Sequence, residues 1–279
     1  MCAAEQGGGE ADDRADSDGS RGGASAAAED RGSPASPVES ALLEDLVAAN
    51  RILFRHGVVD AFGHVSVRHD KDPERFLLSR NMAPGLVGRD DIVEFDLDGT
   101  PVDARGRRVY LERFLHGQIY RARPDVQAVV HSHAPDLLPF GLVQGIELRP
   151  VWHMSGFLGA FGGGAVPLFE IRETAGPASD LLIRDNALGR ALADSLGPAP
   201  VVLMRGHGAT LVGESLPVVV FRSVYTKMNA DVLLRSLPLG PVTYLTEGEA
   251  EATTVTNSSQ IARAWELWKR EAAEAARQP

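Results

Sequence analysis

The chain has 279 residues, of which 44% are hydrophobic and 24% charged, so it can bury a sizeable core in one or two domains. Its formal net charge of -10 and pI near 5.3 argue against nucleic acid and anionic membranes as partners. The single cysteine, Cys2, excludes a disulfide framework, and the sequence has neither a bilayer-spanning apolar run nor the apolar core of a signal peptide. We therefore expect a soluble, cytoplasmic protein.

Residues 1–37 differ in composition from the rest of the chain. They contain no Val, Ile, Leu, Phe, Tyr or Trp, and they hold eight acidic residues against three arginines. Half of the formal charge of the chain therefore lies in this segment. Because it has little apolar surface to bury, it cannot offset the entropy lost on ordering. We predict a disordered acidic tail.

Hydrophobic periodicity predicts alternating helices and strands after this tail. In chain order, we expect a helix over 37–56, strands over 63–68, 75–79 and 92–97, a helix over 111–121, a strand over 126–133, a glycine-rich loop over 159–164, a strand over 166–171, a helix over 186–196, a strand over 201–204, and helices over 216–237 and 260–277. The strands outnumber the connecting helices, and several are joined by hairpin-length loops. This pattern predicts an α/β fold in which helices cover the faces of a largely antiparallel sheet.

The strand predicted over 126–133 ends in two histidines, His131 and His133. Alternate side chains of a strand point the same way, so both imidazoles would lie on one face within reach of one ion. The competing interpretation is a pair of hydrogen-bonded histidines at the end of a buried strand.

A third histidine strengthens the metal interpretation. His207 follows the strand predicted over 201–204 and stands between two glycines, which let the backbone bend sharply and approach a ligand closely. Three neutral imidazoles suit zinc, iron or copper. Three protein ligands with one position left open is the catalytic rather than the structural pattern.

The helix predicted over 111–121 places Glu112 and His116 one turn apart on the same face. A metal with an open position polarises a substrate oxygen, and a general acid/base must then move a proton. Glu112 is the best candidate for that role. The alternatives are a solvated helical face and, for Glu112 alone, a carboxylate that complements the helix dipole.

These motifs resemble the class II aldolase/adducin family over roughly residues 38–250. The resemblance is carried by Glu-x-x-x-His, then Arg-Pro-Asp-Val-x-Ala-Val-Val-His-x-His, then Gly-His-Gly, in this order. It implies an α/β/α sandwich around a largely antiparallel sheet, usually assembled as a homotetramer with active sites between subunits. The domain organisation is then an acidic tail over 1–37, a class II aldolase/adducin-like metal-binding domain over 38–250, and a helical extension over 251–279.

The resemblance also implies roles for individual residues. A divalent metal (zinc, manganese or iron(II)) would bind His131, His133 and His207. Glu112 would act as general acid/base and also ligate the metal in the resting enzyme. Some family members use a tyrosine near the C-terminus, and Tyr225 is a loose match to it.

The sequence departs from the sugar-phosphate aldolases of the family, which hold phosphate with Gly-Asn, Thr/Ser-Gly and a Ser-Ser pair. Those places read Gly63-His64, Ser79-Arg80-Asn81-Met82 and Tyr110-Leu111, so most of the small hydroxyl groups are gone. A phosphate-free substrate with an apolar or aromatic body is the simpler inference. We expect Ser79 and Arg80 to bind it, since the planar fork of an arginine suits a carboxylate.

A segment with bulky side chains supplies a further candidate for substrate binding. His153, with Trp152 and Phe157 beside it, is expected to wall the pocket. The alternative is that the aromatic residues of this segment belong to the core.

The sequence looks most like two non-sugar branches of the family. One holds decarboxylases of hydroxylated aromatic acids such as 3,4-dihydroxyphthalate. The other holds non-haem iron oxygenases of aminocoumarin antibiotic biosynthesis, which oxidatively decarboxylate prenylated 4-hydroxyphenylpyruvate and then a mandelate. The spacing of three histidines does not distinguish zinc or manganese from iron.

We first predict a metal-dependent lyase that cleaves the bond to the carboxyl group of a small hydroxylated aromatic acid. Glu112 or His116 would deliver the proton. The second hypothesis is the iron(II) oxygenase, which requires dioxygen. The third is a non-catalytic scaffold like the adducin head, and the presence of Glu112 and all three histidines argues against it.

Overall fold

The computed structural model describes residues 38–162 and 164–277, so the acidic tail predicted over 1–37 lies outside the described residues. Its centre is a seven-stranded sheet in the order β3-β2-β1-β4-β7-β6-β5. Among the strands of the described residues, the pairing of β5 with β6 is parallel and the other five pairings are antiparallel. The strands are β1 His64–Arg68, β2 Arg75–Ser79, β3 Ile92–Asp96, β4 Ala128–Ser132, β5 Leu168–Phe169, β6 Val201–Met204 and β7 Gly208–Gly213.

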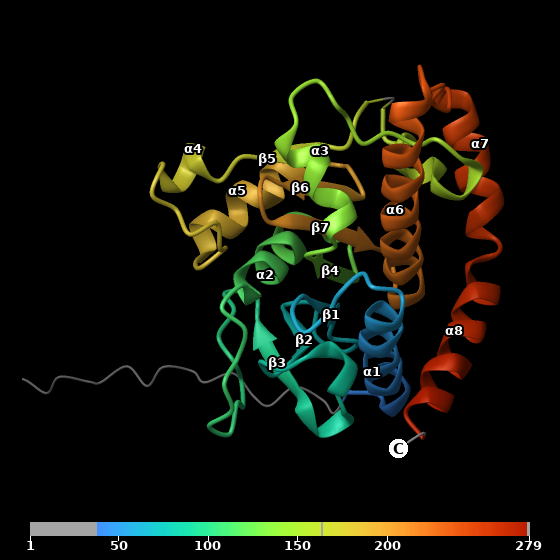
Figure 1. Cartoon of the computed structure of the whole chain (residues 1–279). Helices are drawn as coiled ribbons and strands as arrows, with labels where there is room; N and C mark the ends of the chain where they lie inside the picture. The colour runs from blue at the N-terminus through green and yellow to red at the C-terminus, as the bar shows by residue number, and fades with distance from the viewer. Residues whose placement is uncertain (1–37, 163, 278–279) are drawn as a thin grey trace, which may run out of the picture. The chain divides into compact units, whose positions relative to one another are not determined.

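Helices flank this sheet on both sides (Figure 1). The α-helices of the described chain are α1 Ser40–Arg55, α2 Arg113–Ala122, α3 Leu138–Leu142, α4 Arg172–Ala175, α5 Asn186–Leu196, α6 Leu216–Ser236, α7 Glu247–Ser258 and α8 Ile261–Ala275. Helices α1 and α6 lie on one side of the sheet, and α8 packs outside them, while α2 and α5 pack together on the other side. None of the helices in the described ranges is long and apolar enough to cross a membrane.

Two apolar clusters, one on each face, hold the layers together. Because alternate strand residues point to opposite faces, Ala128 and Val130 of β4 join the cluster formed with α1 and α6. Val129, between them, joins the cluster formed with α2 and α5. The molecule is therefore an α/β/α sandwich around a largely antiparallel sheet, as the sequence predicts.

Several elements differ from the prediction. The strand expected over 166–171 is reduced to the two residues of β5, which pairs only with β6 at the end of the sheet. Strand β7 and helices α4 and α7 were not predicted, and the domain boundary expected at residue 250 falls inside α7. Helix α8, beyond that boundary, contributes Trp265 and Trp268 to the core cluster under α1 and α6.

The first residue of β7 lies against the last residue of β4. A Cβ atom on Gly208 would lie 2.0 Å from the carbonyl oxygen of Ser132, far inside van der Waals contact. We expect Gly208→Ala to force the two strand ends apart and to lower the free energy of unfolding by roughly 2–3 kcal/mol. Urea denaturation with an unchanged slope would measure this loss.

The matched control is Gly248→Ala, because Gly248 lies in α7 with open space where its Cβ would be. Its stability should equal or exceed that of the wild type. Equal denaturation midpoints for wild type and Gly208→Ala would contradict the close approach of β7 to β4.

Candidate metal centre

Four side chains from three parts of the chain converge where the central strand β4 ends beside the start of β7. His131 lies on β4, and His133 follows directly after that strand. His207 occupies the tight turn between β6 and β7, and Glu112 is the residue that precedes α2. The antiparallel pairing of Ser132 with Ala209 brings the end of β4 beside the start of β7, so all three histidines meet.

The three imidazoles present their Nε2 atoms to a common point. The Nε2–Nε2 distances are 2.8 Å for His131 and His133, 3.0 Å for His133 and His207, and 3.3 Å for His131 and His207. Oε2 of Glu112 lies 3.4 Å from Nε2 of both His131 and His207. Ligands about 2.1 Å from a tetrahedral ion lie about 3.4 Å from one another, so the set is close to the size of a metal shell.

The loop that contains Leu181 and Ile183 orients two of these four side chains, His207 and Glu112. Nδ1 of His207 lies 2.7 Å from the carbonyl oxygen of Leu181 and donates to it, which leaves Nε2 with a free lone pair. The backbone N–H of Ile183 donates to Oε1 of Glu112 at 3.0 Å. Leu181 has a φ of 68°, a left-handed conformation that is costly for a non-glycine residue and is typical of functional sites.

The charges of the site suit a cation. Burial alone would raise the pKa of Glu112, but the adjacent imidazoles of His131 and His207 hold it well below its ordinary value. Burial and the neighbouring histidines lower the pKa of His133 to about 4, and burial also lowers that of His131. Burial would lower the pKa of His207 as well, but its hydrogen bond to Glu112 and the charge of that carboxylate raise it above the ordinary value. The set therefore presents an ionised carboxylate with neutral imidazoles at His131 and His133, and a divalent metal would replace the proton that Glu112 favours on His207, so these residues fit such an ion.

His116 is not part of this set. It is fully buried on α2, where its Nε2 lies 2.7 Å from Nδ1 of His64 and its Nδ1 lies 2.7 Å from Oγ of Ser66. His64, which sequence analysis did not select, separates it from His131: the two ring centroids are 4.8 Å and 5.0 Å from that of His64. Direct proton delivery by His116 stays a prediction.

The predicted substrate residues Ser79 and Arg80 lie at the end of β2. Ser79 is buried with its Oγ 3.3 Å from the hydroxyl of Tyr110, and that hydroxyl donates to the carbonyl of Met82. The guanidinium of Arg80 is paired with Asp91 at 2.7 Å. The ring of Tyr110 packs against His64 with centroids 4.6 Å apart, so Ser79 is linked to the neighbourhood of the metal centre through Tyr110, whereas the side chain of Arg80 is held by Asp91.

Tyr225 and His153 lie elsewhere in the monomer. Both line a pocket of about 440 Å³ along α6 and α8. The ring of Tyr225 contacts those of Phe221, Trp152 and Trp268 and none of the four converging side chains. The substrate and acid/base roles of these two residues remain predictions that the arrangement within one chain does not bring to the metal centre.

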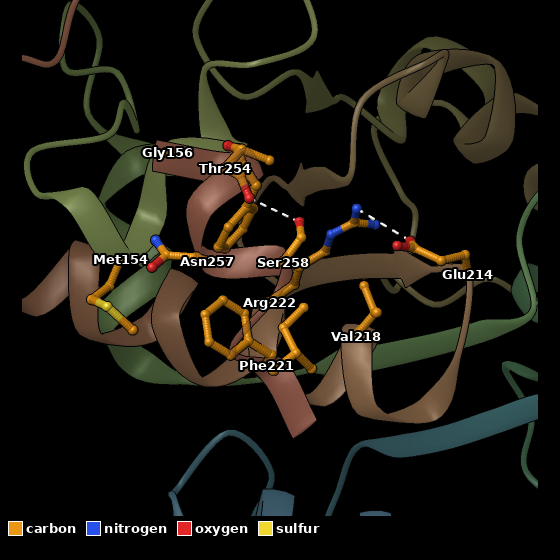
Figure 2. A pocket seen from close by; sticks show the side chains of 11 residues that line it. Met154, Gly156, Glu214, Val218, Phe221, Arg222, Thr254, Asn257 and Ser258 are labelled. Carbon is orange, nitrogen blue, oxygen red and sulfur yellow. Dashed lines mark hydrogen bonds and ion pairs between the residues drawn. The ribbon is translucent and has the colours of Figure 1, made fainter. Parts of the chain in front are cut away.

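A neighbouring hollow lies between α6, α7 and the segment around Met154 (Figure 2). Its volume is about 20 Å³, which is room for a water molecule and far too little for an aromatic acid. Arg222 reaches its wall and pairs with Glu214 at 3.3 Å. Of the residues predicted to wall the substrate pocket, Phe157 lines this hollow, and His153 and Trp152 do not.

The fold and the four converging side chains together define a class: α/β/α sandwich proteins with a candidate single-metal centre where the central strand of the sheet ends. Within that class, the sequence model of the "Class II Aldolase and Adducin N-terminal domain" matches residues 44–234. The chain belongs to the class II aldolase/adducin family.

Its curated relatives include proteins from the non-sugar branch of the family. "Decarboxylase tropJ" of Talaromyces stipitatus is 41% identical over 248 residues, which cover 81% of this chain and 91% of that protein. The "3,4-dihydroxyphthalate decarboxylase" of Arthrobacter keyseri is 31% identical over 214 residues, covering 71% of this chain and 79% of the relative. A Streptomyces roseochromogenus "4-hydroxy-3-prenylphenylpyruvate oxygenase/4-hydroxy-3-prenylbenzoate synthase" is 33% identical over 127 residues, covering 45% of this chain and 42% of that protein.

Solved structures agree on the fold. An aldolase II superfamily protein from Pseudomonas syringae superposes with a TM-score of 0.70 at 21% identity, covering 88% of this chain and 96% of that one. The L-fuculose 1-phosphate aldolase of Glaciozyma antarctica gives a TM-score of 0.68 at 22% identity, with 87% and 97% covered. At these identities the likeness concerns the fold alone.

Proposed function

We propose that the protein is a metal-dependent lyase that removes the carboxyl group of a small hydroxylated aromatic acid as carbon dioxide. The observation that carries this proposal is the position of Tyr110. Its phenol oxygen contacts Oγ of Ser79, the carbonyl of Met82 and, at 3.5 Å, the backbone nitrogen of Met82. Ser79 and Met82 stand at positions where sugar-phosphate aldolases hold phosphate. The Tyr110 side chain thus takes up their hydrogen-bonding groups, which favours a substrate without phosphate.

His131, His133 and His207 would hold the divalent metal (zinc, manganese or iron(II)), which when bound supplies positive charge to a substrate oxygen. Decarboxylation breaks the bond between the ring and the carboxyl carbon, and the electron pair stays on the ring until a proton arrives. Glu112, ionised and anchored by the N–H of Ile183, can take the proton of the substrate's phenol group and deliver it to the ring carbon that has lost the carboxyl group.

The alternative function is a non-haem iron(II) oxygenase that oxidatively decarboxylates a prenylated 4-hydroxyphenylpyruvate or a mandelate in antibiotic biosynthesis. It is favoured by the relative from Streptomyces roseochromogenus and by a ligand set that also suits iron(II). A non-catalytic, adducin-like scaffold is the third hypothesis, and the convergence of all four polar side chains argues against it. In each case we propose a cytoplasmic homotetramer.

The test is the metal content of the protein purified without oxygen, followed by parallel measurements of oxygen uptake and carbon dioxide release. The substrates are a dihydroxyphthalate-type acid and a 4-hydroxyphenylpyruvate-type acid. We expect carbon dioxide release from the dihydroxyphthalate-type acid without oxygen uptake. Bound iron with oxygen consumed in step with carbon dioxide would favour the oxygenase, and a metal-free protein would revive the scaffold.

A further inference from the structure

A line of four buried polar side chains runs inward from the metal centre. His64, His116, Ser66 and Tyr120 are joined by three hydrogen bonds of 2.7 Å each. Their exposed fractions are 3% for His64, 1% for Tyr120 and zero for the other two. The acid/base chemistry proposed above uses none of them. The hydrogen bonds of such a line all donate in the same direction, either towards the metal centre or away from it.

The inner end of the line decides the order. The hydroxyl of Tyr120 has Ser66 Oγ as its only side-chain hydrogen-bond partner among the described residues. A buried phenol that fails to donate is costly, so its proton points to Ser66. Ser66 then donates to Nδ1 of His116, and His116 must carry its own proton on Nε2.

The same reasoning fixes the outer end. Nε2–H of His116 donates to Nδ1 of His64, so the proton of His64 is on its Nε2. This Nε2 has no hydrogen-bond partner among the described side chains, and it is not fully enclosed.

His64 stands beside the metal centre because of the strand register. It is paired with His131 across β1 and β4, and the two rings are 5.0 Å apart between centroids. Its ring also packs against that of Tyr110, which stands at a position where the family resemblance places phosphate-binding residues. An unpartnered N–H at this position can serve an acceptor that enters the site with the substrate.

We propose that Nε2–H of His64 is a fixed hydrogen-bond donor to an anionic oxygen of the substrate. His116, Ser66 and Tyr120 are positioning residues that hold His64 in this tautomer. The nature of the acceptor, a carboxylate or phenolate, rests on the proposed function, whereas the tautomer does not. An imidazole locked as a donor favours anionic oxygens over neutral carbonyl groups and rejects groups that can only donate.

The first experiment reads the tautomer directly. The full-length protein is loaded with zinc and labelled with ¹⁵N-histidine, and long-range ¹H–¹⁵N spectra distinguish a protonated ring nitrogen from an unprotonated one. We expect His64 and His116 to carry their protons on Nε2 only, with the signals assigned by their loss in His64→Gln and His116→Leu. A proton on Nδ1 of His64 would overturn the proposal.

The positioning role has its own readout. His116→Leu removes the donor to Nδ1 of His64, so a second His64 tautomer should appear in the same spectra while zinc content stays unchanged. An unaltered single tautomer would show that His116 does not set it. If this variant does not fold, the spectrum of the wild type still decides the tautomer.

The second experiment measures binding of 3,4-dihydroxybenzoate to the zinc-loaded protein by calorimetry. His64→Leu should weaken binding by roughly 10- to 100-fold, whereas His64→Gln, which keeps an N–H at a similar reach, should stay within about 3-fold. Equal binding by wild type and His64→Leu would refute the donor role. Absence of binding to the wild type would instead count against the proposed substrate class, and the tautomer measurement would be unaffected.

Discussion

The His131→Ala protein should bind divalent metal at least about 100-fold more weakly than the wild type and should be purified without it. His131 is the fully buried member of the three, and its Nε2 lies within 3.4 Å of His133, His207 and Glu112. Its replacement by alanine therefore removes the ligand atom that lies close to all three of the others. Elemental analysis gives the metal content, and competition with a chromophoric chelator gives the affinity.

His153→Ala is the matched control, because His153 is exposed and lies in the pocket along α6 and α8, outside the converging set. It should keep the metal content of the wild type. If His131→Ala binds one equivalent of metal with the affinity of the wild type, the metal site does not include His131.

The second large effect concerns turnover rather than binding. Glu112→Gln should retain the metal and lower kcat by roughly 10²- to 10⁴-fold, the usual contribution of a general acid/base. The amide oxygen of a glutamine can still accept from the N–H of Ile183, so the geometry is preserved. The amide cannot take up and return a proton. Carbon dioxide release from a dihydroxyphthalate-type acid measures the rate.

Glu173→Gln, at an exposed carboxylate on α4, should leave the rate unchanged. Full activity in Glu112→Gln would show that the acid/base assignment is wrong. Loss of metal together with activity would show that Glu112 acts chiefly as a ligand.

Sequence reasoning located the converging histidines because each carries a local signal. His131 and His133 are two residues apart at the end of the predicted strand over 126–133, and His207 stands in a glycine turn after another predicted strand. The pattern could not show that these strands are near each other. That proximity comes from β7, whose six residues begin and end in glycine and were not recognised as a strand after the turn at His207.

Other parts of the site have no sequence signal at all. The carbonyl of Leu181 and the N–H of Ile183 act through the backbone, so their side chains do not reveal them. His64 needs three elements, β1, β4 and α2, to be placed before its partners appear. Tyr225 was selected on a loose match to a family residue, and its surroundings in this chain are aromatic.

Helix α7 was missed for a different reason. Only Ala250 of its twelve residues is buried, so it has no apolar stripe for periodicity to detect. Its start is nevertheless marked by Thr246 and Glu249, whose side chains cap each other's backbone N–H groups. A search for capping signals beside the search for periodicity would have found it.

The pairing of His64 with His131 across β1 and β4 bears on how such a protein diversifies. Neighbours on one rung of a sheet share a backbone frame, yet each side chain can be exchanged without moving the other. Mutation at position 64 can therefore alter which molecules are accepted while the ligand at position 131 stays in place. Related proteins can in this way inherit the same metal ligands and still differ in the substrate that they accept.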